Sequence, residues 1–141
     1  MPFLRPNEPL KVAVLNGWNF KTLTEDGSEV RLRNGRLLRG RTGATTDGLS
    51  GPKWIKARIQ DDNTFKPACI HDFGYHWQLE ESFDAGMNWQ RIRPTKDEVD
   101  AILFELCLDN NVPAWECKAI YEAVHEFGQK AWDDDAPLRG E

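Results

Sequence analysis

The sequence predicts an α+β fold, in which a small N-terminal antiparallel β-sheet is followed by three C-terminal α-helices. Residues 1–66 alternate short β-prone runs with turn residues, whereas residues 67–132 show the spacing of amphipathic helices. With 141 residues, of which 40% are hydrophobic, the chain is long enough for one globular core. We therefore expect a single domain over residues 1–132, mainly β up to residue 66, and a flexible acidic tail over residues 133–141.

Four short runs in the first half favour β-strands because they combine branched and aromatic residues with flanking turn residues. The second and third runs are separated by EDGS, in which Asp-Gly supplies the positive φ of a tight turn, so we expect these two runs to form a hairpin. The four runs are KVAVL (11–15), WNFKTL (18–23), EVRLR (29–33) and GRLLRG (35–40).

Three segments of the second half are predicted to be helices, over residues 67–78, 95–110 and 114–132, with a loop at 79–94. Thr95, followed by acidic residues in the first turn, has the pattern of an N-cap. The third segment spaces its apolar residues at about 3.6, which predicts a face turned toward the core. That face would consist of Trp115, Cys117, Ile120, Tyr121, Val124, Phe127 and Trp132.

Composition argues against several classes of function, although a local basic patch is compatible with it. A net charge of −5 and a pI near 5.2 argue against nucleic acid and anionic membranes as partners, because both attract basic surfaces. Three cysteines without close pairing favour a reducing compartment over a disulfide framework or a structural zinc site. The N-terminal run MPFLRPNEPL has the pattern of neither a signal peptide nor a transmembrane segment.

The stretch ACIHDFGYHW holds two of the three histidines of the chain. On a helix, His71 and Tyr75 share one face, and Asp72 and His76 share the neighbouring face. Imidazole can transfer a proton or bind a metal, and a carboxylate can orient it or share the metal. The alternative is that His71 is a buried side chain satisfied by a backbone carbonyl, with Asp72 and His76 in solvent.

Two further regions supply polar groups that could join this stretch. Asp100 lies on the apolar line of its predicted helix, where a carboxylate needs a partner, either His71 or Lys96. The run TTDGLSGPKW, with Asp47 and Ser50, combines small residues with an acid and a hydroxyl just before the helices. By itself, such a run is also typical of a plain turn.

The order T-T-D-G-L-S-G-P, I-H-D-F-G-Y, K-D-E-V-D and Y-E-A-V-H-E-F-G-Q-K-A-W resembles an uncharacterised family of phage and prophage proteins, the domain of unknown function 1353. The resemblance covers roughly residues 30–132 and implies a phage or prophage origin, without an established reaction. Leu49, Gly51 and Lys96 depart from the family pattern. The matching positions are Thr46, Asp47, Ser50, Pro52, His71, Asp72, Tyr75, Asp100, Gly128 and Trp132.

A local resemblance concerns H-D-x-x-Y, which is similar in spacing to the catalytic helix of secreted phospholipases A2. That resemblance implies that His71 activates water, Asp72 holds calcium, and Tyr75 braces an acid from a second helix, here Asp100. Flanking disulfide cysteines and a glycine-rich calcium loop are not recognisable in the sequence, so we treat the resemblance as a mechanistic analogy.

Three hypotheses follow from these patterns. In the first, the protein is a small hydrolase of an ester, lipid or amide bond, with His71 as general base oriented by Asp100 and Tyr75. A divalent cation, the one cofactor that this hypothesis includes, would be held by Asp72 and Asp47; in a variant, Ser50 is the nucleophile.

In the second hypothesis, the protein is a non-catalytic virion, tail or assembly protein, and the polar cluster is a structural network. In the third, His71, Asp72, His76 and His125 bind a metal without hydrolysis. The corresponding partners are other phage proteins, or a small-molecule, lipid or peptidoglycan substrate. The expected location is the host cytoplasm or the phage particle.

Overall fold

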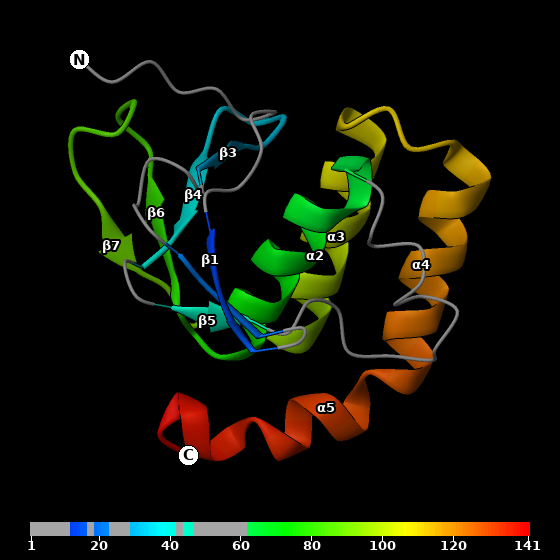
Figure 1. Ribbon diagram of the computed structural model, residues 1–141. Coiled ribbons are helices and arrows are strands. Elements are labelled where there is room, and N and C mark those ends of the chain that lie inside the picture. Colours follow the sequence, from blue (N-terminus) through cyan, green and yellow to red (C-terminus); the bar gives the residue numbers. More distant parts are fainter. Residues whose placement is uncertain (1–11, 17–18, 23–28, 42–43, 47–61) are drawn as a thin grey trace.

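A computed structural model describes residues 12–16, 19–22, 29–41, 44–46 and 62–141. Its described strands form two antiparallel sheets, one of three strands in the order β1-β2-β5 and one of four strands in the order β3-β4-β6-β7 (Figure 1). The strands are β1 (Val12–Asn16), β2 (Asn19–Thr22), β3 (Val30–Arg31), β4 (Leu37–Gly40), β5 (Thr45–Thr46), β6 (Leu79–Ser82) and β7 (Gln90–Arg91).

The helices follow from residue 62 onward and confirm the α+β class. The prediction of three helices is wrong in number, because the segment 114–132 is divided at Gly128. A Cβ at Gly128 would clash with the Val124 carbonyl oxygen and would lie 2.7 Å from the Tyr75 hydroxyl, so only glycine fits there. The described helices are α2 (Asp62–Tyr75), α3 (Lys96–Asp109), α4 (Ala114–Phe127), α5 (Gln129–Asp134) and the 3-10 helix η2 (Ala136–Arg139).

The four predicted strand runs agree in position with β1, β2, β3 and β4, but the predicted hairpin is wrong. β2 pairs with β1 and β5, whereas β3 pairs with β4 in the other sheet. The turn residues 25–28, on which that prediction depended, lie outside the described residues.

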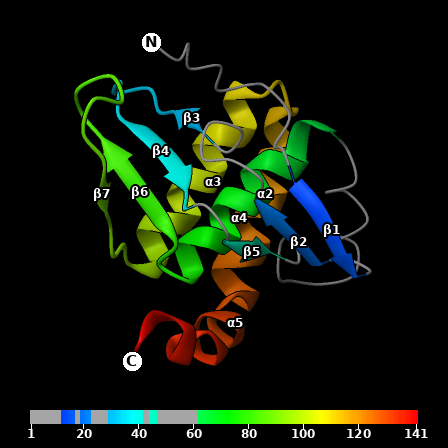
Figure 2. The ribbon, with the colours of Figure 1, turned by 60° about the vertical axis from the view of Figure 1, so that its left-hand side comes forward.

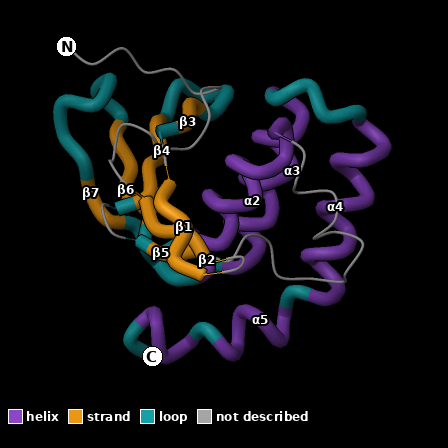
Figure 3. Tube along the Cα trace, viewed as in Figure 1, coloured by secondary structure: helices purple, strands orange, loops and turns teal. Residues whose placement is uncertain are grey.

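Helix α2 lies at the centre of the molecule, between the strands on one side and α3 and α4 on the other (Figures 1 and 3). Its apolar side chains enter two cores. One core joins α2 to the four-stranded sheet through Cys69, Ile70 and Phe73, and the other joins it to α3 and α4 through Ala68. The turned view shows α2 passing behind β5, with α5 below (Figure 2).

The segment 79–94 contains two strands and not the predicted loop. Strand β6 pairs with β4, and β7 pairs with β6, so the sheet is completed after α2 and not before it. The run LEES buries Leu79 and Ser82 at its two ends, and this spacing lacks the alternation that marks a half-buried strand.

The C-terminal segment, which was expected to be a flexible acidic tail, is folded into helical turns in the structure. Residues up to Asp134 belong to α5, η2 follows, and Arg139 is 6% exposed. The guanidinium of Arg139 donates hydrogen bonds to the carbonyl oxygens of Tyr75 and Trp132, at 3.0 and 2.8 Å. A basic residue near the end of the chain therefore fastens this segment to the end of α2.

The predicted core face of the third helix is partly confirmed. Cys117, Ile120 and Val124 are buried, whereas Trp115 and Phe127, at the two ends of α4, are exposed. All three cysteines are buried free thiols. Among the helices in the described ranges, none has the length and apolar character that crossing a membrane requires.

Candidate active site

The candidate active site lies where α2 packs against α3. His71 and Tyr75 are one turn apart on α2, and Lys96 and Asp100 are one turn apart on the first half of α3. The start of α3 is fixed as predicted, because Thr95 is the N-cap and its side chain accepts a hydrogen bond from the Glu98 backbone N–H.

The Asp100 carboxylate is the centre of the cluster. Its Oδ1 lies 2.7 Å from Nε2 of His71 and accepts a hydrogen bond from the Tyr75 hydroxyl at 2.8 Å. Its Oδ2 accepts a hydrogen bond from Nζ of Lys96 at 2.7 Å. The sequence left His71 and Lys96 as alternative partners of Asp100, and the structure places both against it.

These four side chains are almost entirely buried, with exposed fractions of 0% for Asp100, 1% for Tyr75, 2% for His71 and 8% for Lys96. Burial raises the pKa of the Tyr75 hydroxyl, and the Asp100 charge raises it further. Burial also lowers the pKa of His71 below 6.5, against the opposing effect of the hydrogen bond that His71 donates to Asp100, so the imidazole is neutral at pH 7.

The Asp100 carboxylate is ionised at neutral pH. Burial would raise its pKa, but the hydrogen bonds that it accepts from His71, Lys96 and Tyr75 together lower it. The network therefore contains one carboxylate, one ammonium group and a neutral imidazole.

Lys96 also ties this network to α4. Its Nζ donates hydrogen bonds to the carbonyl oxygens of Val124 and His125, at 3.1 and 3.3 Å. These carbonyls lie in the last turn of α4, where the helix dipole favours a cation. One ammonium group therefore connects α3 with α4 while it neutralises Asp100.

A second polar cluster lies on the neighbouring face of α2, as the helical spacing predicted for Asp72 and His76. Nε2 of His76 lies 3.5 Å from Oδ1 of Asp72 and 3.2 Å from Oδ2 of Asp135. Asp72 is buried, and the other two side chains are partly buried. Asp135 could not be expected here, because the run DDDAP carries no signal beyond its charge.

The set of metal ligands in the third hypothesis is divided by the structure. His71 contacts Asp100, whereas Asp72 and His76 lie with Asp135. His125 is exposed, with its Nδ1 3.9 Å from Asp97. Although Asp97, Asp100 and His125 are also close together, Asp100 is already bound by three other side chains.

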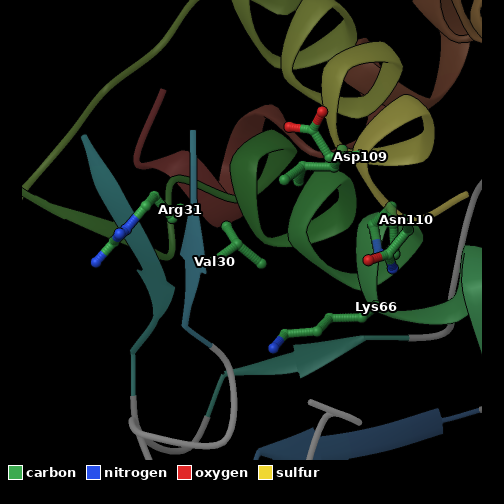
Figure 4. A pocket seen from close by; sticks show the side chains of 7 residues that line it. Val30, Arg31, Lys66, Asp109 and Asn110 are labelled. Atoms are coloured by element: carbon green, nitrogen blue, oxygen red, sulfur yellow. The ribbon is translucent and has the colours of Figure 1, made fainter. Parts of the chain in front are cut away.

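Two predicted site residues, Asp47 and Ser50, lie outside the described residues. Figure 4 shows a narrow pocket between β3, the first half of α2 and the end of α3, with Val30, Lys66 and Asp109 in its wall. None of the predicted site residues that the structure describes lines this pocket. This pocket therefore does not support a catalytic role of His71.

The fold and the paired helices place this chain among small α+β domains with a buried His–Asp pair. Residues 22–124, well over half of the chain, match the model of a family described as protein of unknown function (DUF1353), and the chain belongs to this family. Comparison with curated proteins and with solved structures finds no match.

Proposed function

We propose that this protein is a hydrolase in which His71 is the general base that activates water for attack on an ester or amide bond, including those of lipids. The observation that carries the proposal is the 2.7 Å contact between Nε2 of His71 and Oδ1 of Asp100, with Tyr75 and Lys96 holding the same carboxylate. A carboxylate fixed in this way selects one tautomer of the imidazole.

The tautomer decides which nitrogen can act. In neutral His71, Nε2 carries the hydrogen that is donated to Asp100, so Nδ1 keeps its lone pair. Among the described residues, none forms a hydrogen bond with Nδ1. This nitrogen can accept a proton from a water molecule, and the lowered pKa of His71 keeps it unprotonated at neutral pH.

The local similarity to secreted phospholipases A2 supports the same assignment, since there too a tyrosine one turn after the histidine braces the partner acid. In this proposal, Asp72 contributes to a cation site, and Asp47 and Ser50 remain candidates for a second cation ligand and a nucleophile. The oxyanion formed during attack would be stabilised by that cation.

The test uses His71→Gln, because glutamine can still donate an amide hydrogen to Asp100 but has no basic nitrogen. The wild-type protein should hydrolyse at least one member of a panel of chromogenic esters, phospholipids and peptidoglycan, with divalent ions present. The variant should lose activity by about 100-fold or more, the range of general-base catalysis. Initial rates and the thermal midpoint of each protein are measured together.

His125→Gln is the matched control, because it removes an exposed imidazole and should leave both the rate and the midpoint unchanged. A folded wild-type protein that is inert on the whole panel, with and without divalent ions, would contradict the proposal. Undiminished activity of His71→Gln would contradict it as well.

A structural role is the second candidate, and the burial of the network favours it. Asp100 is 0% exposed and His71 is 2% exposed, and all three hydrogen-bonded partners of Asp100 come from α2 and α3. A fully satisfied buried network fixes the packing of the elements that carry it. In this case His71→Gln would shift the thermal midpoint and there would be no activity to lose.

We also propose a phage or prophage setting, with the host cytoplasm or the phage particle as location and other phage proteins as partners. The motif order that resembles phage and prophage proteins supports it. Copurification of the protein with virions would place it in the particle. Its presence only in the lysate of infected cells would place it in the cytoplasm.

A further inference from the structure

We propose that Asp72, His76 and Asp135 form a binding site for one divalent transition-metal ion, which joins the last turn of α2 to the C-terminal segment. The sequence pointed to Asp72 and His76, but only the structure adds Asp135 from the far end of the chain. The site shares Asp72 with the hydrolase proposed above, but it requires nothing of His71, so ion binding can be tested separately from hydrolysis.

The distances from His76 to the two carboxylates are compatible with metal ligands. Two ligands that are each about 2.1 Å from a tetrahedral ion lie about 3.4 Å apart. Nε2 of His76 lies 3.5 Å from Asp72 and 3.2 Å from Asp135, and the three ligand atoms are all within 4.8 Å of one another. An N–H···O hydrogen bond is typically about 2.7–3.2 Å, so the Asp72 contact is too long for a good one.

The donor set determines the class of ion. One imidazole nitrogen with two carboxylates suits zinc, manganese or ferrous iron. Calcium prefers six to eight oxygen ligands and is bound by histidine far less readily. Three protein ligands also leave a coordination position for water or another group, which is the arrangement found in catalytic rather than structural zinc sites.

The fold holds the three ligands in place before any ion binds. Asp72 and His76 are one turn apart, and the His76 backbone N–H donates to the Asp72 carbonyl oxygen at 3.2 Å. Asp135 is held between α5 and η2, because its N–H donates to the Ala131 carbonyl and its carbonyl accepts from Leu138. Arg139 then fastens this turn to Tyr75, next to His76.

In a competing explanation, the contacts of His76 with the two carboxylates are ordinary polar contacts without a metal. The two explanations differ in a direct measurement. Protein stripped with a chelator and then titrated with ZnCl₂ or MnCl₂ in a calorimeter should bind one ion per chain. His76→Gln and Asp135→Asn should each weaken binding by about 100-fold or more, since loss of a residue that only hydrogen-bonds to a metal ligand already costs about 10–100-fold.

His125→Gln is again the matched control, because it removes an exposed histidine of the other His–Asp cluster and should bind the ion as the wild type does. Zinc at about 100 times the wild-type Kd should raise the wild-type Tm by several degrees and raise that of Asp135→Asn much less. Failure of the wild type to bind, or equal affinity in wild type, His76→Gln and Asp135→Asn, would overturn the site. Zinc binding by a protein without hydrolase activity would support this site and contradict the hydrolase.

Discussion

Asp100 accepts hydrogen bonds from three side chains, and the energetic cost of its burial depends on them. A carboxylate removed from water is costly unless a charge and hydrogen bonds replace its hydration. Lys96 supplies the only full positive charge among the three partners, since His71 is neutral at pH 7. The stability of the protein should therefore depend on both Lys96 and Asp100, because loss of either one leaves the other buried without its counter-charge.

Lys96→Met should destabilise the protein by about 3–5 kcal/mol, because methionine fills the space of the stem but leaves Asp100 buried without its cation. Urea unfolding followed by circular dichroism measures this loss. Lys118→Met is the matched control: Lys118 forms an exposed pair with Glu122, so its loss should cost less than about 0.5 kcal/mol. Equal effects of the two substitutions would show that Asp100 does not depend on Lys96.

The lowered pKa of His71 predicts how stability varies with pH. Burial lowers this pKa in the folded protein, whereas in the unfolded chain it has its ordinary value of 6.5. Between these two values the unfolded chain binds a proton that the folded chain does not, so stability rises with pH across this window and is lost as pH falls below 6.5. The slope contributed by one group is at most about 1.4 kcal/mol per pH unit.

Urea midpoints between pH 7.5 and pH 5 should therefore fall for the wild type and fall less steeply for His71→Gln, in which the group is absent. His76 and His125 are present in both proteins, so the difference belongs to His71. Parallel curves would mean that His71 is protonated equally in the folded and the unfolded state. The Asp100 contribution is lost at lower pH, below its ordinary value of 3.8.

At the scale of the elements, α2 and α3 approach closely at Gly74. A Cβ added there would lie 2.7 and 2.9 Å from the two terminal carbons of Val99, far inside van der Waals contact. The glycine therefore sets the distance between the helices that carry His71 and Asp100. A wider spacing would separate the imidazole from the carboxylate.

Gly74→Ala should destabilise the protein by about 1–3 kcal/mol, the usual cost of overpacking a core. Combining it with Val99→Ala should recover part of this loss, because the clashing carbons are removed. A double-mutant cycle from urea unfolding should give a coupling energy of about 0.5–3 kcal/mol. Additive effects would contradict the close approach of these two residues.

Elements with a strong local signal could be predicted from the sequence. The start of α3 followed from Thr95 and the acids after it, and four strand positions followed from β-prone runs. Strand pairing could not be predicted, because β4 reaches β6 across α2 and the choice of partner depends on distant packing. The start of α2 was also missed, since Pro67 was assumed to open the helix and lies inside it.

The two polar clusters on α2 also differ in how far the sequence could predict them. The contact of His71 with Asp100 was one of two that the sequence offered, because a carboxylate on an apolar helix face needs a partner. The contact of His76 with Asp135 was not predicted, because it depends on the turn between α5 and η2. The spacing of residues along a regular helix indicates which side chains share a face and need a partner. The position of the C-terminal segment depends instead on tertiary contacts, which leave no pattern in the sequence.

At the scale of the whole molecule, the C-terminal segment crosses below α2 and the strands, and Arg139 fastens it (Figure 1). The Arg139 guanidinium lies 3.7 Å from the centre of the Trp132 ring, and it donates to the Tyr75 carbonyl. Detaching this segment would remove Asp135 from the end of α2 without touching α3.

Arg139→Met should therefore expose the last helix while the core stays folded. The lost hydrogen bonds leave two carbonyls unpaired, at a cost of about 1–3 kcal/mol. Hydrogen exchange should speed up for amides of residues 129–141 and stay unchanged for those of α3. Lys130→Met, which removes an exposed pair with Asp134, is the control and should leave exchange unaltered; faster exchange there too would argue against an anchor at Arg139.

The three buried thiols give the molecule internal reporters of its own opening. Cys69 lies between α2 and the four-stranded sheet, whereas Cys107 and Cys117 lie between α3 and α4. Burial raises the pKa of Cys107 to about 12, so its reactive thiolate is scarce until the helices separate. The rate at which an alkylating reagent labels each buried thiol would consequently report how often the surrounding core opens to solvent.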